Sequence, residues 1–312
     1  PLGAKGIAIV KAEASFTVDE KVGLKPDELK KIIGDYDAIL VRSETKLTAE
    51  ILDLAKNLKI IGRAGVGVDN VDLNAATKKG IIVMNTPEGN TISTCELTVS
   101  HLLAMNRNIP QANQSMKNGE WNRKAFKGSE LMGKTLGVIG FGRIGREVAK
   151  RMLSFGMQVL AYDPFILPES VKGVDVAFAN LDEIYAKADY ITIHTPLVPE
   201  TKNLINKESI AKMKNGVRIV NCARGGIIDE AALLEALKSG KVKGAGLDVY
   251  EEEPPKNKEL VAHPAVVATP HLGASTDEAQ INVTIAIAEQ IVAYLTTGEI
   301  KGAVNFPSVS AE

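Results

Sequence analysis

Short apolar runs alternate with longer stretches in which apolar residues recur at helical spacing. In the first part of the chain the apolar runs predict strands near 6–10, 37–41, 58–62 and 81–84. The stretches between them predict helices near 26–34, 48–56 and 71–79. Further along, strands are predicted near 135–139, 157–162, 190–194, 217–221, 244–248 and 266–268. This alternation is typical of an α/β protein, and the two series of strands indicate a smaller and a larger doubly wound parallel sheet.

Two longer segments have helical patterns of their own. Residues 91–108 carry apolar side chains on more than one face, and a helix of that kind is usually buried between domains or subunits. The last helix is predicted over 276–297, with Ser275 or Thr276 as its N-cap and Gly298 just past its end. The wide apolar face of the first of these helices predicts a homodimer, with a tetramer as the alternative.

The strand predicted at 135–139 runs directly into glycines spaced G-x-G-x-x-G. Gly140 can make the tight turn, Gly142 can admit a pyrophosphate to the backbone, and Gly145 can let the next helix pack closely on the sheet. The amino end of that helix then faces the phosphates. The following strand ends in Asp163, whose carboxylate can bond a ribose diol and repel a 2′-phosphate. This spacing predicts a dinucleotide site for NAD rather than NADP.

Arg224 lies just past the strand predicted at 217–221 and is followed by two glycines and a helix start at Asp229. Ligands of doubly wound sheets bind outside the carboxyl ends of the strands. The guanidinium of Arg224 can bind a substrate carboxylate through two hydrogen bonds. The alternative for a lone arginine in this place is a salt bridge to a nearby acid.

Four histidines are candidates for the proton exchange that accompanies hydride transfer to or from a carbinol carbon. His271 lies at the end of the last predicted strand. His194 also ends a strand and is the rival candidate. His101 falls within the helix predicted at 91–108, which we expect to be interfacial, and His263 falls in a loop.

A group of acids follows the strand before His271. That strand ends in Asp248, and Glu251, Glu252 and Glu253 come next, before two prolines. A carboxylate that accepts a hydrogen bond from an imidazolium raises the histidine pKa and fixes its tautomer, so one of these acids can tune His271. Residue types alone do not choose among them, and three consecutive acids also fit a solvated loop.

Composition narrows the classes of partner. The chain of 312 residues has 24% charged residues and a formal charge of −1, with no basic block long enough to follow a nucleic-acid backbone. No apolar run reaches the ~20 residues that a membrane span needs. The two cysteines, Cys95 and Cys222, fit a reducing compartment and are too few for a structural zinc site. We therefore expect a cytoplasmic protein without a metal, a nucleic-acid partner or a membrane association.

Several longer motifs occur together over nearly the whole chain after about residue 18. They are VRSETKLT (41–48), GRAGVGVDNVDL (62–73), NTPEGNT (85–91), GKTLGVIGFGRIGREVA (133–149), VNCARGGIIDE (220–230), LDVYEEEPP (247–255) and PHLGAST (270–276). With these motifs the chain resembles the D-isomer-specific 2-hydroxyacid dehydrogenases, a family of NAD enzymes. Within that family the resemblance is strongest to members that oxidise 3-phosphoglycerate to 3-phosphohydroxypyruvate, the first step of phosphorylated L-serine biosynthesis.

The resemblance implies roles that the residues alone leave open. It implies that Arg224, Glu253 and His271 are catalytic, with His271 as the acid or base. It implies a set of residues that bind NAD, namely Gly140, Gly142, Arg143, Ile144, Gly145, Asp163, His194, Thr195, Cys222, Ala223, Asp248, Gly273 and Ala274. The residues that it implies for substrate binding are Arg42, Ser43, Arg63, Gly65 and Asn90. The two arginines of this last set can bind a phosphate.

The resemblance also implies a domain arrangement that explains why the glycine loop comes so late in the chain. A Rossmann NAD-binding domain, residues 89–274, is expected to be inserted in a smaller flavodoxin-like substrate-binding domain, residues 1–88 and 275–312. The first residues, PLG, lack an initiator methionine and suggest a trimmed end. Longer members of the family continue past the point that matches VNFPSVSAE (304–312) into domains that bind serine. Because this chain stops at that point, we expect no feedback by serine.

Two other functions stay open at this point. One is the reduction of hydroxypyruvate or glyoxylate by an enzyme of the same family. The other is an NAD-sensing transcriptional corepressor, a binding protein that also resembles this family and keeps Arg224, Glu253 and His271. A preference for a phosphorylated acid argues against the first alternative, and binding of a peptide identifies the second.

Overall fold

The computed structural model describes residues 2–306 and divides the chain into two compact units. The larger unit is Thr91–Gly273, and the smaller unit combines the residues up to Asn90 with those from Ala274 onward. Both boundaries differ slightly from the expected ones after residues 88 and 274, and the first lies directly before the helix that begins at Thr91. Residue 1 and residues 307–312, which the expected smaller domain includes, lie outside the described residues.

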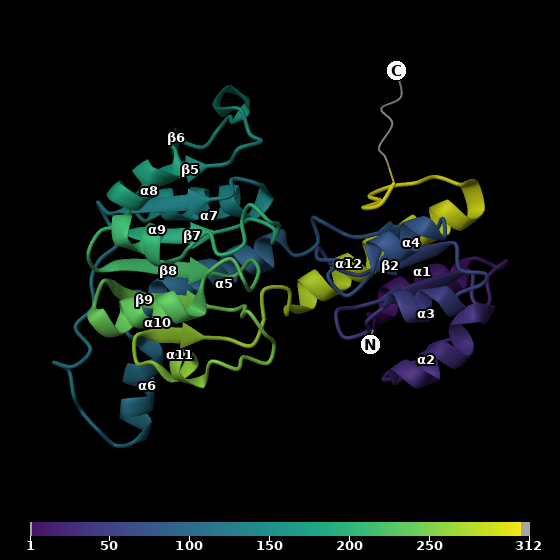
Figure 1. The fold of residues 1–312 in the computed structure, drawn as a ribbon, viewed down its shortest axis with the longest axis horizontal. Helices are drawn as coiled ribbons and strands as arrows, with labels where there is room; N and C mark the ends of the chain where they lie inside the picture. The colour runs from purple at the N-terminus through teal and green to yellow at the C-terminus, as the bar shows by residue number, and fades with distance from the viewer. Residues whose placement is uncertain (1, 307–312) are drawn as a thin grey trace. The chain divides into compact units, whose positions relative to one another are not determined.

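The larger unit is built on one parallel sheet of seven strands (Figure 1). Its strands in chain order are β4 (Thr135–Ile139), β5 (Gln158–Tyr162), β6 (Ala177–Phe178), β7 (Tyr190–Ile193), β8 (Val217–Asn221), β9 (Val242–Leu247) and β10 (Val266–Ala268). Their spatial order is β10-β9-β8-β7-β4-β5-β6, and every neighbouring pair is parallel. The order reverses between β4 and β7, which is where doubly wound sheets open a crevice for ligands. The expected α/β fold with a Rossmann sheet is confirmed.

Helices cover both faces of this sheet. They are α5 (Thr91–Asn106), α6 (Ile109–Lys117), α7 (Arg143–Ser154), α8 (Leu181–Lys187), α9 (Lys207–Lys212), α10 (Glu230–Ser239) and α11 (Lys258–Ala262), with a short 3-10 turn, η2 (Pro168–Ser170). One apolar core lies under α8, α9 and α10, and the other under α5 and α7. Within β8, Ile219 belongs to the first core and Val220 to the second, which is the alternation of a strand buried on both faces.

The smaller unit has a parallel sheet of three strands that lie side by side in chain order. They are β1 (Ala38–Val41), β2 (Ile60–Arg63) and β3 (Ile82–Met84). The helices of this unit are α1 (Ala4–Ala12), α2 (Pro26–Ile32), the 3-10 turn η1 (Ile33–Asp35), α3 (Ala49–Leu54), α4 (Leu73–Lys78) and α12 (Asp277–Thr297). One face of the sheet packs against α2, α3 and α4, and the other against α12, where Ile287 and Ile291 are fully buried. The last helix of the chain is therefore part of a core that its first ninety residues also build.

The expected strand at 6–10 is wrong, because these residues form part of α1. Helix α1 packs along α12 instead of joining the sheet. A run of five apolar or small residues shows neither the period of a strand nor that of a helix, so packing decides between them. Without this strand the three-stranded sheet has no reversal in its order, and it is not doubly wound in the strict sense.

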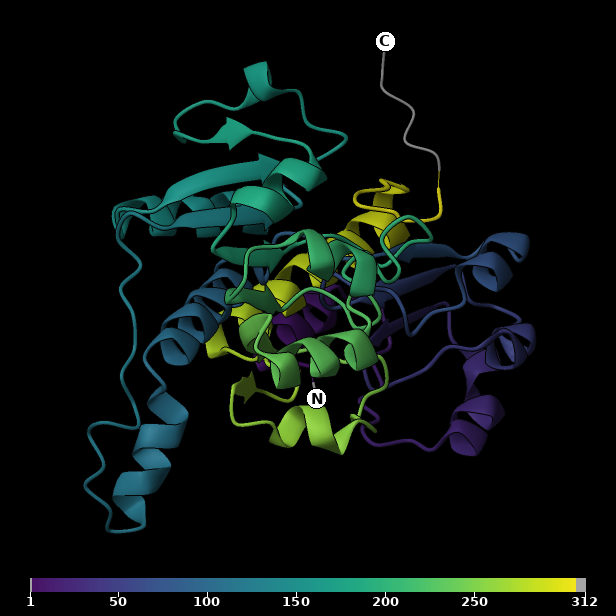
Figure 2. The same cartoon turned by 60° about the vertical axis from the view of Figure 1, so that its left-hand side comes forward.

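Much of the wide apolar surface of helix α5 packs inside its own unit. Its residues Cys95, Leu102 and Met105 are buried in the core that α5 shares with α7. Much of the surface that predicted a homodimer is therefore covered within the larger unit, and the homodimer stays a prediction. Ile92 of α5 is exposed, and the other large exposed apolar side chains of this region lie on α6 and the loop after it, which project away from the sheet (Figure 2). They are Ile109, Met116, Trp121 and Met132.

Helix α12 has the caps that its sequence predicted. The side chain of Thr276 accepts a hydrogen bond from the backbone N–H of Ala279, and Gly298 follows the helix with a φ of 76°. Neither α12 nor any other helix within residues 2–306 is long and apolar enough to cross a membrane.

Candidate active site

The side chains expected to react follow three neighbouring strands of the larger sheet. Arg224 lies just past β8, Glu253 is in the loop after β9, and His271 follows β10. Because these strands are parallel neighbours, their carboxyl ends lie at one edge of the sheet. The fold therefore brings together three residues that are well separated in the chain.

Glu253 and His271 form a hydrogen-bonded pair. The Nδ1–H of His271 donates to the Glu253 carboxylate across 2.7 Å, which leaves Nε2 for proton exchange. This hydrogen bond raises the pKa of His271 above its ordinary value, although burial opposes it. Burial raises the pKa of the Glu253 carboxyl, but the hydrogen bond and charge of His271, the Tyr250 N–H and the charge of Arg224 together outweigh burial, and the net shift is downward. The pair therefore favours an imidazolium beside a carboxylate.

Arg224 adds a positive charge next to this pair. Its charge lowers the pKa of both Glu253 and His271, which is the effect of a nearby cation on either group. The backbone N–H of Tyr250 donates to the second oxygen of Glu253 at 3.3 Å and so limits the rotation of the carboxylate. The arrangement offers a cation for a substrate carboxylate beside a group that can exchange a proton.

The loop that carries His271 is held by Asp248, which is fully buried. Its carboxylate accepts hydrogen bonds from the Thr269 hydroxyl at 2.6 Å, the Leu272 N–H at 2.7 Å and the Gly273 N–H at 2.9 Å. His271 has a φ of 53°, a left-handed conformation that costs a residue with a side chain about 1 kcal/mol or more. The hydrogen bonds to Asp248 offset that cost. Asp248 was expected to line the cofactor, and that role stays a prediction; its carboxylate also holds the loop of His271.

Burial lowers the pKa of two of the other histidines, which favours their neutral form. Burial lowers the pKa of His194 to about 3, and its Nε2 lies 3.0 Å from the Thr192 hydroxyl. Burial also lowers the pKa of His101, whose Nε2 lies 2.9 Å from the Thr269 hydroxyl. His101 is thus packed inside its own unit rather than at a subunit interface. Of these three histidines, His271 is the one with a carboxylate partner for its ring.

The glycine loop has the shape that a dinucleotide requires. Gly140 adopts a φ of 92°, and a Cβ on it would lie 2.7 Å from the backbone that follows β7. Gly145 brings α7 so close to β4 that a Cβ there would lie 2.2 Å from the carbonyl oxygen of Gly140. At Gly142, in contrast, a Cβ would meet nothing within 4 Å. Open space at the start of α7 is what the approach of a pyrophosphate needs, so the loop fits the cofactor.

The other residues expected to bind NAD belong to the same edge of the sheet. Asp163 directly follows β5 and accepts backbone hydrogen bonds from Phe141 and Phe165, both at 2.9 Å and one on each oxygen. Its oxygens keep further lone pairs for a ribose diol. The buried Thr195 hydroxyl has no partner among the described residues, so a bound ligand can satisfy it. The rest lie at the start of α7 or in the turns after β8 and β10, and they are Arg143, Ile144, Cys222, Ala223, Gly273 and Ala274.

The residues expected to bind substrate lie in the smaller unit, most of them where its strands end. Arg63 is the last residue of β2, and Gly65 lies two positions further on. The register of β1 on β2 places Arg42 and Ser43 just past the neighbouring strand end. Asn90 ends the first segment of the unit, and its buried Oδ1 has no partner within residues 2–306. The two arginines therefore lie at adjacent strand ends.

The described part of the chain contains no set of side chains that could bind a metal ion. No group of three or more histidine, cysteine or acidic side chains among residues 2–306 could hold a metal ion. Cys95 and Cys222 are both buried and unpaired. Burial raises the pKa of both thiols, that of Cys95 to about 11, so neither offers a thiolate near neutral pH.

Two residues that the sequence did not single out brace the site. The buried Asn221 donates from its side-chain amide to the carbonyl of Arg224 at 2.8 Å and accepts from the N–H of Ala223 at 3.0 Å. Thr269 links His101 to Asp248 through its hydroxyl. A polar residue at the end of an apolar strand was an available signal for Asn221. Thr269 gave no signal, because its partners come from other elements.

Comparison with known proteins agrees with this geometry. Residues 99–273 match the family described as D-isomer specific 2-hydroxyacid dehydrogenase, NAD binding domain. The D-3-phosphoglycerate dehydrogenase of Bacillus subtilis (strain 168) is 52% identical over 304 residues, which are 97% of this chain and 57% of that protein. A protein of solved structure from Thermus thermophilus is 36% identical, with 97% of each chain covered and a TM-score of 0.88. The D-lactate dehydrogenase of Aquifex aeolicus, solved with NAD and lactic acid, is 32% identical, with 89% of this chain and 90% of that one covered and a TM-score of 0.81.

The chain therefore belongs to the D-isomer specific 2-hydroxyacid dehydrogenase family, and residues 99–273 match its NAD-binding domain. The family that the motifs predicted is confirmed, and NAD is confirmed as the cofactor. The chain spans 57% of the length of its Bacillus relative.

Alanine substitutions at Gly142 and Gly145 test two separate features of the glycine loop. The first tests the space left for the cofactor, and the second tests the close contact between helix and strand. We expect Gly142→Ala to leave the free energy of unfolding nearly unchanged but to weaken NADH binding at least about tenfold, because its methyl group fills the open space at the helix start. Gly145→Ala should lower both quantities, since its Cβ would overlap the Gly140 carbonyl oxygen. Urea unfolding and fluorescence titration with NADH measure the two effects. Wild-type NADH affinity in Gly142→Ala would contradict this placement of the pyrophosphate.

Glu253→Gln should lower the pKa of His271, because the hydrogen bond to the carboxylate raises that pKa. Reduction of a 2-oxo acid needs a protonated imidazole, so kcat/KM is constant at low pH and falls as the pH rises through this pKa. In Glu253→Gln the fall should begin at lower pH. Profiles of kcat/KM against pH check this, with Glu252→Gln as the control for charge. An unmoved midpoint in Glu253→Gln would show that the carboxylate does not tune His271.

Proposed function

We propose that this protein catalyses the NAD-dependent oxidation of 3-phospho-D-glycerate to 3-phosphohydroxypyruvate, the first step of phosphorylated L-serine biosynthesis. The observation that carries the proposal is the hydrogen bond between His271 and Glu253, next to Arg224, in an NAD-binding domain of this family. The 52% identity with the D-3-phosphoglycerate dehydrogenase of Bacillus subtilis supports the choice of substrate.

Each residue of the site has a distinct part in the chemistry. NAD, when bound, supplies the nicotinamide that accepts the hydride from C2 of the hydroxyacid. Arg224 binds the substrate carboxylate and polarises the oxygen on C2. The Nε2 of His271 takes the hydroxyl proton while its Nδ1–H stays bonded to Glu253. Glu253 stabilises the imidazolium that forms, and in the reverse direction the same imidazolium returns the proton to the carbonyl oxygen.

The phosphate of the substrate is assigned to Arg42 and Arg63. These arginines lie at adjacent parallel strand ends of the smaller unit. The side-chain oxygen of Gln280 accepts a hydrogen bond from Arg42 at 2.9 Å, which orients that guanidinium. Arginine binds phosphate through paired charge-assisted hydrogen bonds, and hydroxypyruvate and glyoxylate offer no phosphate to bind. These two charges favour a phosphorylated acid over the substrates of the reductase alternative.

A cytoplasmic homodimer completes the proposal. Both cysteines are buried and unpaired, which fits a reducing compartment. On and after α6, exposed apolar side chains such as Trp121 (76% exposed) and Met132 (74% exposed) give a second copy a surface to cover. Elution at the mass of a monomer in gel filtration would rule the dimer out.

Substrate preference is the direct test of this function. NADH oxidation by the purified protein is measured with 3-phosphohydroxypyruvate, hydroxypyruvate and glyoxylate at equal concentrations. We expect kcat/KM to be at least about tenfold higher for the phosphorylated acid, because charge-assisted bonds to phosphate are available to that substrate alone. Arg42→Gln and Arg63→Gln should each remove most of this preference. Lys46→Gln, which removes an exposed cation from the loop after β1, is the control and should retain it.

Two results would contradict the proposal in different ways. A preference for an unphosphorylated acid would make the protein a general reductase of the same family, with the roles of Arg224, Glu253 and His271 unchanged. No turnover of any of the three acids, together with binding of a peptide that depends on NADH, would favour the corepressor alternative.

A further inference from the structure

Two loops of the larger unit carry the reacting groups, and they are in backbone contact. The first runs from the end of β8 to α10 and contains Arg224, and the second follows β9 and contains Glu253. Gly225 marks the contact, because a Cβ on it would lie 1.6 Å from the carbonyl oxygen of Tyr250. The position of Arg224 relative to Glu253 therefore depends on how these two loops are joined.

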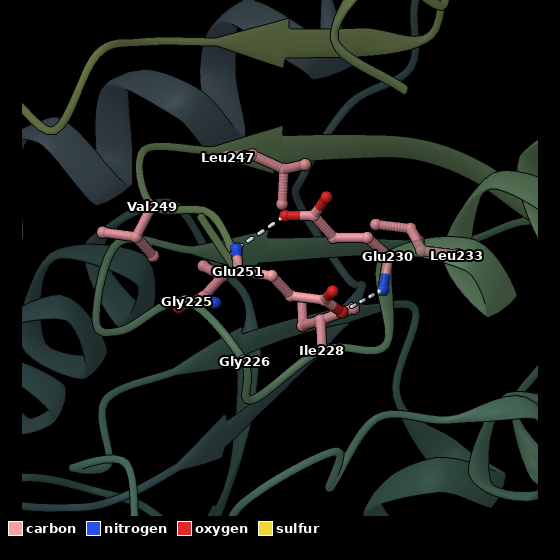
Figure 3. A pocket seen from close by; sticks show the side chains of 9 residues that line it. Gly225, Gly226, Ile228, Glu230, Leu233, Leu247, Val249 and Glu251 are labelled. Atoms are coloured by element: carbon pink, nitrogen blue, oxygen red, sulfur yellow. Dashed lines mark hydrogen bonds between the residues drawn. The ribbon is translucent and has the colours of Figure 1, made fainter. Parts of the chain in front are cut away.

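A reciprocal pair of hydrogen bonds joins them a few residues further on. The backbone N–H of Glu230 donates to the carboxylate of Glu251 at 3.0 Å, and the backbone N–H of Glu251 donates to the carboxylate of Glu230 at 2.8 Å (Figure 3). We call Glu230 and Glu251 the carboxylate clasp. Each side chain satisfies the backbone of the other loop, so neither loop can shift along the other without breaking both bonds.

The clasp borders a small pocket whose other wall reaches the base of the Arg224 loop. Asn221 lines this pocket together with Gly225 and the two clasp residues. The same Asn221 donates to the carbonyl oxygen of Arg224 at 2.8 Å. One continuous set of hydrogen bonds and pocket contacts therefore runs from the backbone of Arg224 to the loop after β9.

On the other side of the clasp, the contacts continue to the acid–base pair. Glu251 lies between Tyr250 and Glu253, and the Tyr250 N–H donates to the Glu253 carboxylate at 3.3 Å. The other carboxylate oxygen of Glu253, Oε2, accepts from His271 at 2.7 Å. A displacement of Glu251 would thus move the turn that Glu253 closes, and with it the partner of His271.

The clasp places acidic side chains close together at a partly buried position, which does not by itself stabilise the fold. Glu230 is 9% exposed, and two further acids, Glu251 and Glu252, lie close by. Burial raises the pKa of Glu230, and the charges of those two acids add to the effect. Like-charged groups at a partly buried contact oppose folding, whereas a fixed distance between two reacting groups favours turnover.

We infer that Glu230 and Glu251 are positioning residues for hydride transfer, which hold Arg224 at a fixed distance from the Glu253–His271 pair. The inference rests on the proposed function of Arg224, Glu253 and His271. Substrate is then oriented by Arg224 at the place where His271 exchanges its proton. Neither clasp residue touches the reacting atoms, and both act through the two loops.

The test compares removal of the clasp with its conservative repair. Glu251→Ala deletes the acceptor for the Glu230 N–H, and Glu251→Gln keeps a carbonyl oxygen there. Glu252→Ala is the matched control, because Glu252 is the next residue and its carboxylate pairs with Lys256 at 2.5 Å instead of with a loop. The measurements are kcat and KM for 3-phosphohydroxypyruvate and NADH, and the pKa of His271 from the pH titration of its ring protons by NMR.

In Glu251→Ala we expect kcat to fall at least about tenfold with KM for NADH within about twofold of wild type, because a shift of the loops misplaces the reacting groups and not the cofactor. The pKa of His271 should fall at the same time. Glu251→Gln should restore both quantities, and Glu252→Ala should change neither. Wild-type kcat and His271 pKa in folded Glu251→Ala would overturn the inference, as would equal losses in Glu251→Gln and Glu251→Ala.

Glu230→Ala tests the other half of the clasp. If the two hydrogen bonds act together, kcat of the double variant Glu230→Ala/Glu251→Ala should be no lower than kcat of the slower single variant. Should Glu230→Ala fail to fold, Glu251→Ala still decides, since the side chain of Glu251 is exposed. The NMR measurement separates this inference from the proposed function. If wild-type protein turns over no 2-oxo acid, the function fails, and a His271 pKa that falls in Glu251→Ala but not in Glu251→Gln still supports the clasp.

Discussion

All seven strands of the larger sheet run parallel, and this constraint decides where the residues proposed to react lie. A parallel strand brings the residue that follows it to the same edge as its neighbours do, so Arg224, Glu253 and His271 meet although they come from three separate segments. The reversal of order between β4 and β7 opens the same edge for NAD beside the glycine loop. In the smaller unit the same rule brings Arg42 and Arg63 to adjacent strand ends. The turns that carry chemistry are thus anchored on rigid strands.

Carboxylates at this edge of the sheet have three different roles, which depend on the groups from which they accept hydrogen bonds. The buried Asp248 accepts from the backbone of the His271 loop and holds that loop in its left-handed conformation. Glu253 accepts from the imidazole itself and raises its pKa. Glu230 and Glu251 accept from each other's backbone and join two loops. The imidazole is therefore tuned by Glu253 and held in place by Asp248, while Glu230 and Glu251 join the two loops beside it.

The apolar runs of the sequence predicted most strands of both sheets, because turn residues mark where those runs begin and end. The run at 6–10 was too short to show a period, and its packing on α12 made it a helix. The two-residue strand β6 was too short to be found. The sequence placed Arg224 and His271 at strand ends, but it could not choose Glu253 among three acids without the resemblance to a family. That choice depends on a contact between two loops, which no local pattern encodes.

The most direct test of the central claim is the single-turnover rate of NADH oxidation in His271→Ala, measured with 3-phosphohydroxypyruvate beside the NADH affinity of the same variant. His263→Ala, in which a histidine is removed from a loop away from the strand ends expected to react, is the control. If His271 exchanges the substrate proton, the rate should fall about 10²- to 10⁴-fold in His271→Ala while NADH binds as tightly as it does to wild type. A rate within about twofold of wild type would show that another group moves the proton, and it would contradict the account.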